Sequence, residues 1–269
     1  MARTQRDLTD AGRAARALAR SGLAAIRVPQ DLPELTRHGF PEAETQGLAP
    51  LLKLGLVRPV ARGLYEVRDS GGVTRSSFEE LLAGRFADTP HLATGWWALA
   101  QAGLTNQDVR TVVVLTPTDR RDLTLAGRRV RVAKARDDLW GGETRKSGLV
   151  IARPERAFCD CAGNARPARI TATRIAEALD AYLDSTPQAV TRLSRAAKRT
   201  DSAVVARRLG YLVELLAGEE AARPLHGLFV PPHKADALDP GDENSPVVTR
   251  WQLRTRLTAD ELLEHRIVS

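Results

Sequence analysis

The stretch from residue 40 to residue 67, FPEAETQGLAPLLKLGLVRPVARGLYEV, constrains the fold most strongly. Leucines at positions 48, 51 and 52 recur at helical spacing, and this helical pattern ends at Gly55. Two strand-like pieces follow, at 57–60 and 64–67, and the three residues between them include Gly63, as is typical of a tight hairpin. The stretch therefore predicts a helix that is followed directly by a short two-stranded hairpin.

A helix followed by a basic hairpin is the outline of a winged helix-turn-helix. We interpret 42–54 as the recognition helix, whose outer face carries Thr45 and Gln46 for base edges and Lys53 for phosphate. Arg58 and Arg62 project from the expected wing and would contact DNA phosphates. Pro50 is expected to kink the helix. Either only 42–49 enters the major groove, or the helix is structural and the wing contributes more of the binding.

The segments before this module complete an N-terminal domain. We expect helices at 7–21 and 30–38 and a strand at 23–28. Arg16 and Arg20 lie one turn apart on the first helix, so they form either a solvated face or a phosphate contact. A polar, glycine-containing link at 69–72 marks the boundary between a domain of residues 1–75 and a domain of residues 76–269.

The second expected domain mixes strands and helices. Its tryptophan pair, Trp96-Trp97, is assigned to core packing on a helix that ends at Gly103. The overall expectation is a mixed α+β protein, with an N-terminal winged helix-turn-helix and a larger C-terminal α/β domain. The expected strands are 109–115, 129–135, 148–153 and 247–253, and the expected helices are 77–86, 154–162, 170–183, 189–200 and 202–217.

The densest basic cluster lies in the helix expected at 189–200. Arg192, Arg195 and Arg199 are spaced i, i+3 and i+7, so they share one helix face. Three interpretations remain open: a solvated surface, a second contact to a polyanion such as DNA, or a docking face for an acidic partner. Arg207 and Arg208 follow one helix later.

Composition adds weaker constraints. Forty basic residues against 33 acidic ones give a formal charge of +7, which suits a polyanionic partner. The closely spaced Cys159 and Cys161 are expected to be reduced thiols on a helix, one buried and one exposed, as in a reducing cytoplasm. There is no apolar run of about 18–20 residues for a membrane span and no signal-peptide pattern near the start, so we expect a cytoplasmic protein without membrane contact.

Motifs of catalysis are absent from the sequence. It lacks a Walker loop, a G-x-G-x-x-G pattern, a zinc-protease histidine pair and a G-x-S-x-G pattern. Asp137 and Asp138 could bind a cation, but salt bridges within a loop are the better interpretation. We therefore expect a protein that is not an enzyme and that uses no metal or cofactor, and an enzyme acting on nucleic acid or nucleotides is kept as an alternative.

Five segments in fixed order resemble a known family. They are RGLYEV at 62–67, HLATGWWALAQAGL at 91–104, VVVLTP at 112–117, RVRVAKA at 129–135 and IARPERAFCDCAG at 151–163. This order is similar to that of the AbiEi-type antitoxins, the regulators of type IV toxin–antitoxin systems, including mycobacterial relatives paired with a nucleotidyltransferase toxin. The resemblance covers about 32–216, and its most specific pieces are 62–65 and 153–157.

The resemblance implies an autoregulating repressor. Its winged helix would bind inverted repeats in double-stranded DNA at its own promoter, and its C-terminal domain would oppose a nucleotidyltransferase toxin, with or without a stable complex. We expect a monomer that pairs on DNA, because no heptad pattern indicates a dimer helix. The alternatives are an interaction module that neutralises its partner by direct docking and a stand-alone transcriptional regulator.

Overall fold

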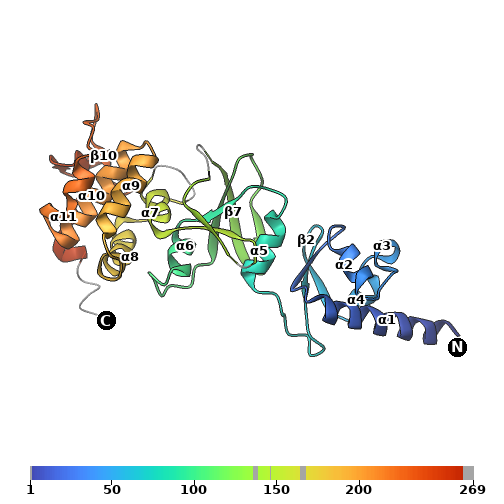
Figure 1. The fold of residues 1–269 in the computed structure, drawn as a ribbon. Coiled ribbons are helices and arrows are strands. Elements are labelled where there is room, and N and C mark those ends of the chain that lie inside the picture. Colours follow the sequence, from blue (N-terminus) through green and yellow to red (C-terminus); the bar gives the residue numbers. More distant parts are fainter. Residues whose placement is uncertain (1, 136–138, 146, 164–167, 263–269) are drawn as a thin grey trace. The chain divides into compact units, whose positions relative to one another are not determined.

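The computed structural model describes residues 2–135, 139–145, 147–163 and 168–262 (Figure 1). It has the expected mixed α+β composition. The chain divides into two compact units. The N-terminal unit comprises Met1–Pro90, Thr124–Arg128 and Thr144–Leu149; the C-terminal unit comprises His91–Leu123, Arg129–Glu143 and Val150–Ser269. The Asp137-Asp138 pair lies outside the described residues.

Four helices and a small sheet form the first part of the N-terminal unit. The helices are α1 (Ala2–Ser21), α2 (Leu32–Arg37), α3 (Ala43–Gln46) and α4 (Ala49–Lys53). The strands β1 (Ala25–Arg27), β2 (Val57–Ala61) and β3 (Leu64–Val67) form an antiparallel sheet in the order β1-β3-β2. Their shared core includes Leu18 from α1, Leu35 from α2, Leu51 from α4 and Ile26 from β1. Figure 1 shows these helices gathered beside β2.

The single helix expected over 42–54 is wrong. Gly47 takes a left-handed conformation with φ of +61° and ends α3, and α4 begins two residues later. Glycine adopts this conformation without steric cost, so it is a natural helix terminator. Pro50 lies in the first turn of α4, where its missing N–H would have no intrahelical partner in any case. The helix is therefore interrupted before the proline rather than kinked by it.

The hairpin of β2 and β3 is present where the sequence predicts it, but the expected three-residue loop at 61–63 is wrong, because Ala61 belongs to β2. Ala61 pairs with Leu64, which leaves Arg62 and Gly63 as a two-residue turn. Gly63 has φ of +71°, and a Cβ there would lie 3.0 Å from the carbonyl oxygen of Val28. Glycine is therefore required at this position for two reasons, its conformation and its close contact with the β1 end.

Helix α5 (Phe78–Phe86) completes the N-terminal unit. Ser77 accepts a hydrogen bond from the amide of Glu80 at 3.1 Å, and the Glu80 carboxylate accepts from the amide of Ser77 at 2.8 Å. This capping box fixes the start of α5, which lies within the helix expected at 77–86. The helix packs closely on the sheet, since a Cβ at Gly84 would lie 3.0 Å from Leu64 Cδ1.

A mixed sheet of six described strands runs in the order β6-β7-β5-β4-β9-β8. Strand β4 pairs antiparallel with β5 and parallel with β9, and β5 pairs parallel with β7. Helix α6 (Trp96–Gln101) buries Trp96 and Trp97, at 8% and 1% exposure, which confirms their assignment to the core. The strand bounds are β4 (Leu92–Thr94), β5 (Thr111–Thr116), β6 (Leu123–Leu125), β7 (Arg128–Lys134), β8 (Gly142–Thr144) and β9 (Val150–Ala152).

Five helices follow the sheet: α7 (Pro154–Ala162), α8 (Ala172–Ser185), α9 (Ala189–Arg199), α10 (Ala203–Ala217) and α11 (Glu219–His226). Figure 1 shows α8 to α11 gathered as a bundle. Arg208, on α10, is buried and donates to the carbonyls of Ala162 and Ala237, both at 2.8 Å. Arg207 is also buried and pairs with Asp236. These two arginines are therefore structural rather than part of an exposed basic cluster.

The strand expected at 247–253 is wrong. The segment forms two short strands, β11 (Val247–Val248) and β12 (Leu253–Arg254), which pair antiparallel. Strand β10 (Asp236–Ala237) joins β12 on its other side, and the 3-10 helix η1 (Asp242–Asn244) lies between β10 and β11 in sequence. The turn includes Trp251, which is fully buried and donates to Glu214 on α10 at 2.9 Å.

Cys159 and Cys161 are both buried, so the expectation that one would be exposed is wrong. Helix α7 is covered by α6, α8, α9 and α10, so positions on several of its faces lie inside the protein. Burial raises the pKa of both thiols, and the nearby Asp160 carboxylate adds to this rise. No helix in the described ranges is long and apolar enough to cross a membrane.

Candidate functional site

The basic residues of α1 lie on its exposed side. Arg16 and Arg20 are exposed, whereas Ala14, Ala17 and Leu18 are buried. The helix thus has the two-sided character that the sequence indicated. The two guanidinium groups are available to solvent at positions one turn apart.

The expected base-reading residues are also exposed. Thr45 and Gln46 lie on the short helix α3, and the Thr45 hydroxyl donates to the carbonyl of Glu42 at 3.2 Å. Lys53 is exposed in the last turn of α4. Because α3 and α4 are separate helices, Lys53 does not continue the helix face that carries Thr45 and Gln46.

The β2–β3 hairpin, which is the expected wing, contains a buried carboxylate that the sequence did not indicate. Glu66 on β3 has a side chain only 3% exposed and lies opposite Arg58 on β2. Arg58 contacts both of its oxygens, at 2.8 and 3.2 Å, and Arg68 approaches it at 3.4 Å. Arg62, at the turn, is exposed and has no acidic partner in the described part of the chain. Arg62 is therefore the wing cation whose charge is least compensated.

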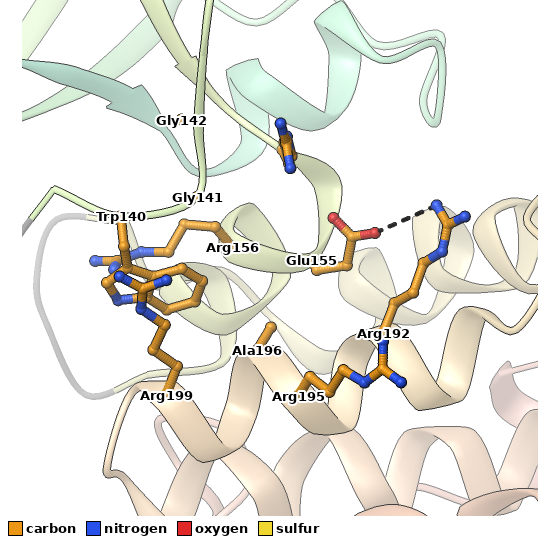
Figure 2. Close-up of a pocket in the computed structure, with 10 residues that line it drawn as sticks. Trp140, Gly141, Gly142, Glu155, Arg156, Arg192, Arg195, Ala196 and Arg199 are labelled. Carbon is orange, nitrogen blue, oxygen red and sulfur yellow. Dashed lines mark ion pairs between the residues drawn. The ribbon is translucent and has the colours of Figure 1, made fainter.

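A second site lies wholly within the C-terminal unit. It is a pocket of about 670 Å³ whose walls carry five guanidinium groups and a single carboxylate. We call it the arginine pocket (Figure 2). Its lining residues are Trp140, Gly141, Gly142, Arg153, Glu155, Arg156, Arg192, Arg195, Ala196 and Arg199.

Helix α9 supplies one wall of the arginine pocket. Arg192, Arg195 and Arg199 are exposed and line it together, whereas Leu193 and Ala197 on the other side of α9 are buried. The shared face predicted for the three arginines is thus present in the structure. Figure 2 shows them extending from successive turns of α9.

The first turn of α7 supplies the facing wall. Glu155 accepts a hydrogen bond from the Tyr182 hydroxyl at 2.6 Å and lies 3.9 Å from Arg192, the contact drawn as a dashed line in Figure 2. Burial raises the pKa of Tyr182, and the bond to Glu155 raises it further. Tyr182 therefore remains protonated and holds the carboxylate in place. The ion pair with Arg192 is long for a charge-assisted contact.

Trp140 anchors two of the arginines. The guanidinium carbon of Arg156 lies 4.4 Å from the centre of the Trp140 ring, and that of Arg199 lies 5.0 Å from it. Both distances are within the range of cation–π attraction. Arg156 is buried and its Nε contacts both oxygens of Asp160 at 3.0 Å. These contacts fix the two guanidinium groups before any ligand arrives.

Gly141 allows Trp140 to approach α7. It has φ of +71°, and a Cβ there would lie 2.9 Å from Arg156 Cβ. The amide of Arg153 donates to the Gly141 carbonyl at 2.8 Å, which ties this turn to the start of α7. The sequence reasoning missed Trp140, Arg153, Glu155 and Arg156 as site residues. The available signals were a tryptophan followed by two glycines and a Pro154-initiated helix flanked by arginines.

The lining of the arginine pocket is rich in cations and poor in metal ligands. In the described residues, no group of three or more histidine, cysteine, aspartate or glutamate side chains could hold a metal ion. The pocket's one carboxylate is already engaged by Tyr182 and Arg192. Its dominant feature is positive charge.

A comparison with solved structures shows what this fold is similar to. The fold is similar to that of a solved protein described as Rv2827c from Mycobacterium tuberculosis, with a TM-score of 0.67 and 19% sequence identity. The match covers 97% of this chain and 94% of the other. No protein-family model matches the chain, and no curated protein matches it. At this identity the likeness concerns the fold alone.

Proposed function

We propose that this protein is an autoregulating antitoxin, which binds double-stranded DNA at its own promoter and opposes a nucleotidyltransferase-type toxin. The observation that carries the DNA-binding part is the N-terminal unit. There the two-residue turn of the β2–β3 hairpin presents Arg62, which has no acidic partner in the described chain. Helix α3 of the same unit exposes the polar residues Thr45 and Gln46. This arrangement supports a winged helix-turn-helix whose wing contacts the DNA backbone.

The antitoxin part has separate support. The five sequence segments resemble the AbiEi-type antitoxins in their order, and the likeness to the M. tuberculosis fold extends over nearly the whole chain. A regulator of this kind needs no catalytic centre. The toxin would be a separate protein, opposed with or without a stable complex.

The DNA-binding residues are not equivalent in this proposal. Arg62 provides a phosphate contact, and Thr45 and Gln46 face bases from α3. Arg58 contributes less than its position suggests, because Glu66 already neutralises it. Arg16 and Arg20 are further candidates for phosphate contacts, and Lys53 acts from a separate helix. A DNA contact for Arg192, Arg195 and Arg199 stays a prediction.

The test is a fluorescence-anisotropy titration of the full chain. The protein is titrated against a duplex from the region upstream of its own gene and against a random duplex of equal length, at several salt concentrations. Much tighter binding to the upstream duplex, with a steep salt dependence, is expected of an autoregulator. Equal and weak binding to both duplexes would remove the basis for the proposal.

Substitution of Arg62 by alanine should weaken binding to both duplexes alike. Loss of one phosphate contact should reduce the log–log salt slope by about 0.9. Arg75→Ala is the matched control, because Arg75 is exposed, lacks an acidic partner in the described chain and lies at the opposite end of β3 from the turn. An Arg62→Ala loss confined to the upstream duplex would contradict the phosphate role.

The α3 residues should behave differently. Thr45→Ala or Gln46→Ala should narrow the affinity gap between the upstream and the random duplex, because contacts to base edges carry the sequence information. An unchanged gap in both variants would rule out base reading by α3.

A further inference from the structure

We propose that the arginine pocket binds an oligophosphate, a chain of two or three linked phosphate groups, either free or as part of a nucleoside di- or triphosphate. This goes beyond the proposed promoter binding: it assigns a small-molecule ligand to the C-terminal unit. The pocket lies within that unit and shares no residue with the wing or with α3. The two proposals can therefore be tested separately.

The charge of the pocket requires a counter-ion. Its lining includes five arginines and only Glu155 as a carboxylate. Arg153 and Arg195 are exposed and have no acidic partner within the described ranges. Arg192 interacts with the Tyr182 hydroxyl, which is neutral, and its acidic partner Glu155 is 3.9 Å away. Three guanidinium groups thus remain wholly or largely uncompensated around one concavity, where the repulsion between them disfavours the empty state.

The geometry favours a chain of phosphates over a single small anion. Arg192 and Arg199 are seven residues apart on α9, which separates their Cα atoms by about 10 Å along the helix axis. The facing wall at the start of α7 adds the exposed Arg153, and the positive end of the helix dipole lies there. One phosphate cannot reach all of these groups. Linked phosphates can, and arginine forks suit phosphate oxygens.

The size and stiffness of the pocket agree with this ligand. A volume of about 670 Å³ lies within the usual range of about 300–1,000 Å³ for small-molecule sites. Trp140 holds Arg156 and Arg199 against its ring, so these side chains lose little freedom on binding. The ring itself is only 9% exposed, which leaves little surface for stacking a base. Recognition is therefore directed at the phosphates and not at the nucleobase.

Isothermal titration calorimetry of the full chain, free of nucleic acid and at physiological ionic strength, tests the proposal. The probes are inorganic tripolyphosphate, ATP, GTP and adenosine. Saturable binding of tripolyphosphate and of both nucleotides, without binding of adenosine, is the expected result. Tighter binding of the nucleotides would identify a nucleotide as the source, and tighter binding of tripolyphosphate would identify a free oligophosphate. Absence of saturable binding by all three phosphate compounds would overturn the proposal.

Substitutions locate the site. Arg195→Ala should weaken tripolyphosphate binding at least about tenfold, equivalent to about 1.4 kcal/mol. Arg174→Ala is the matched control, because Arg174 is an exposed arginine on α8 without an acidic partner among the described residues and lies outside the pocket lining. Equal affinities of the two variants would overturn the assignment.

Glu155→Gln should change the affinity for tripolyphosphate in the opposite direction to Arg195→Ala. Glutamine keeps an acceptor for the Tyr182 hydroxyl, removes the repulsion towards phosphate and releases Arg192, so affinity should rise. Circular dichroism and urea denaturation establish that the variant keeps the fold, and a loss of affinity in the folded variant would contradict the proposal. If Arg195→Ala weakens binding to random duplex DNA and leaves tripolyphosphate binding unchanged, the pocket face is a DNA contact and the proposal is wrong.

Discussion

Gly141 is the position at which the structure makes the sharpest stability prediction. Alanine there must adopt a φ near +71°, which costs about 1–2 kcal/mol for a residue with a Cβ. The new Cβ would also lie 2.9 Å from Arg156 Cβ. That atom is bonded directly to the α7 backbone, so it cannot rotate away as the end of a flexible side chain could.

The steric cost can be separated from the conformational cost. Overpacking of this kind costs about 1–3 kcal/mol, so Gly141→Ala should lower the free energy of unfolding by about 2–5 kcal/mol in total. Gly103 is the matched control, because it has φ of +73° and no atom within 4 Å of an added Cβ. Gly103→Ala should therefore show only the conformational part, about 1–2 kcal/mol.

Urea denaturation followed by circular dichroism measures both variants, and calorimetry with tripolyphosphate measures the pocket. Gly141→Ala should be the less stable variant and should also bind tripolyphosphate more weakly, because the turn that positions Trp140 is displaced. Equal destabilisation by the two substitutions would refute the reasoning. It would mean that the turn moves away from α7 without cost and that the close contact has no structural role.

Two further predictions concern the core of the C-terminal unit. Gly210→Ala should lower the free energy of unfolding by about 1–3 kcal/mol in urea denaturation, because the added Cβ would lie 2.2 Å from the Trp251 ring. This is opposite to the usual effect of alanine, which stabilises a helix by about 0.5–1 kcal/mol relative to glycine. The loss of stability should disappear in a Trp251→Leu background. The buried thiols of Cys159 and Cys161 should resist alkylation until the protein unfolds. Burial raises the pKa of both thiols in the folded state. Their contribution to the free energy of unfolding is therefore complete below the unfolded thiol pKa of about 8.5 and declines as the pH rises above that value. Urea denaturation at pH 7 and at pH 10 measures this decline.

Local signals allowed much of the fold to be predicted. The hairpin around Gly63 and the helices expected at 77–86 and 154–162 depend on signals a few residues long, and the structure has a hairpin, α5 and α7 at these positions. In contrast, helix α11 was missed. Pro224 lies inside it and obscures a helical pattern, and packing against α9 and α10 stabilises it despite the proline.

The site was harder to predict because it depends on residues distant in sequence. The shared face of Arg192, Arg195 and Arg199 follows from helical spacing alone. That Trp140 and Arg156 meet these arginines does not, because it requires the packing of α7 against α9 and the turn at Gly141. Similarly, Arg58 was predictable as a wing residue, but its neutralisation depends on the burial of Glu66 across the strand pair.

The interleaving of the two units has a consequence for how such a protein can be altered genetically. The chain crosses between the units at residues 90/91, 123/124, 128/129, 143/144 and 149/150. A single recombination point therefore cannot exchange one intact unit for that of a homologue, because two short segments of the N-terminal unit would be left behind. Chimaeras that preserve both units must transfer residues 1–90, 124–128 and 144–149 together.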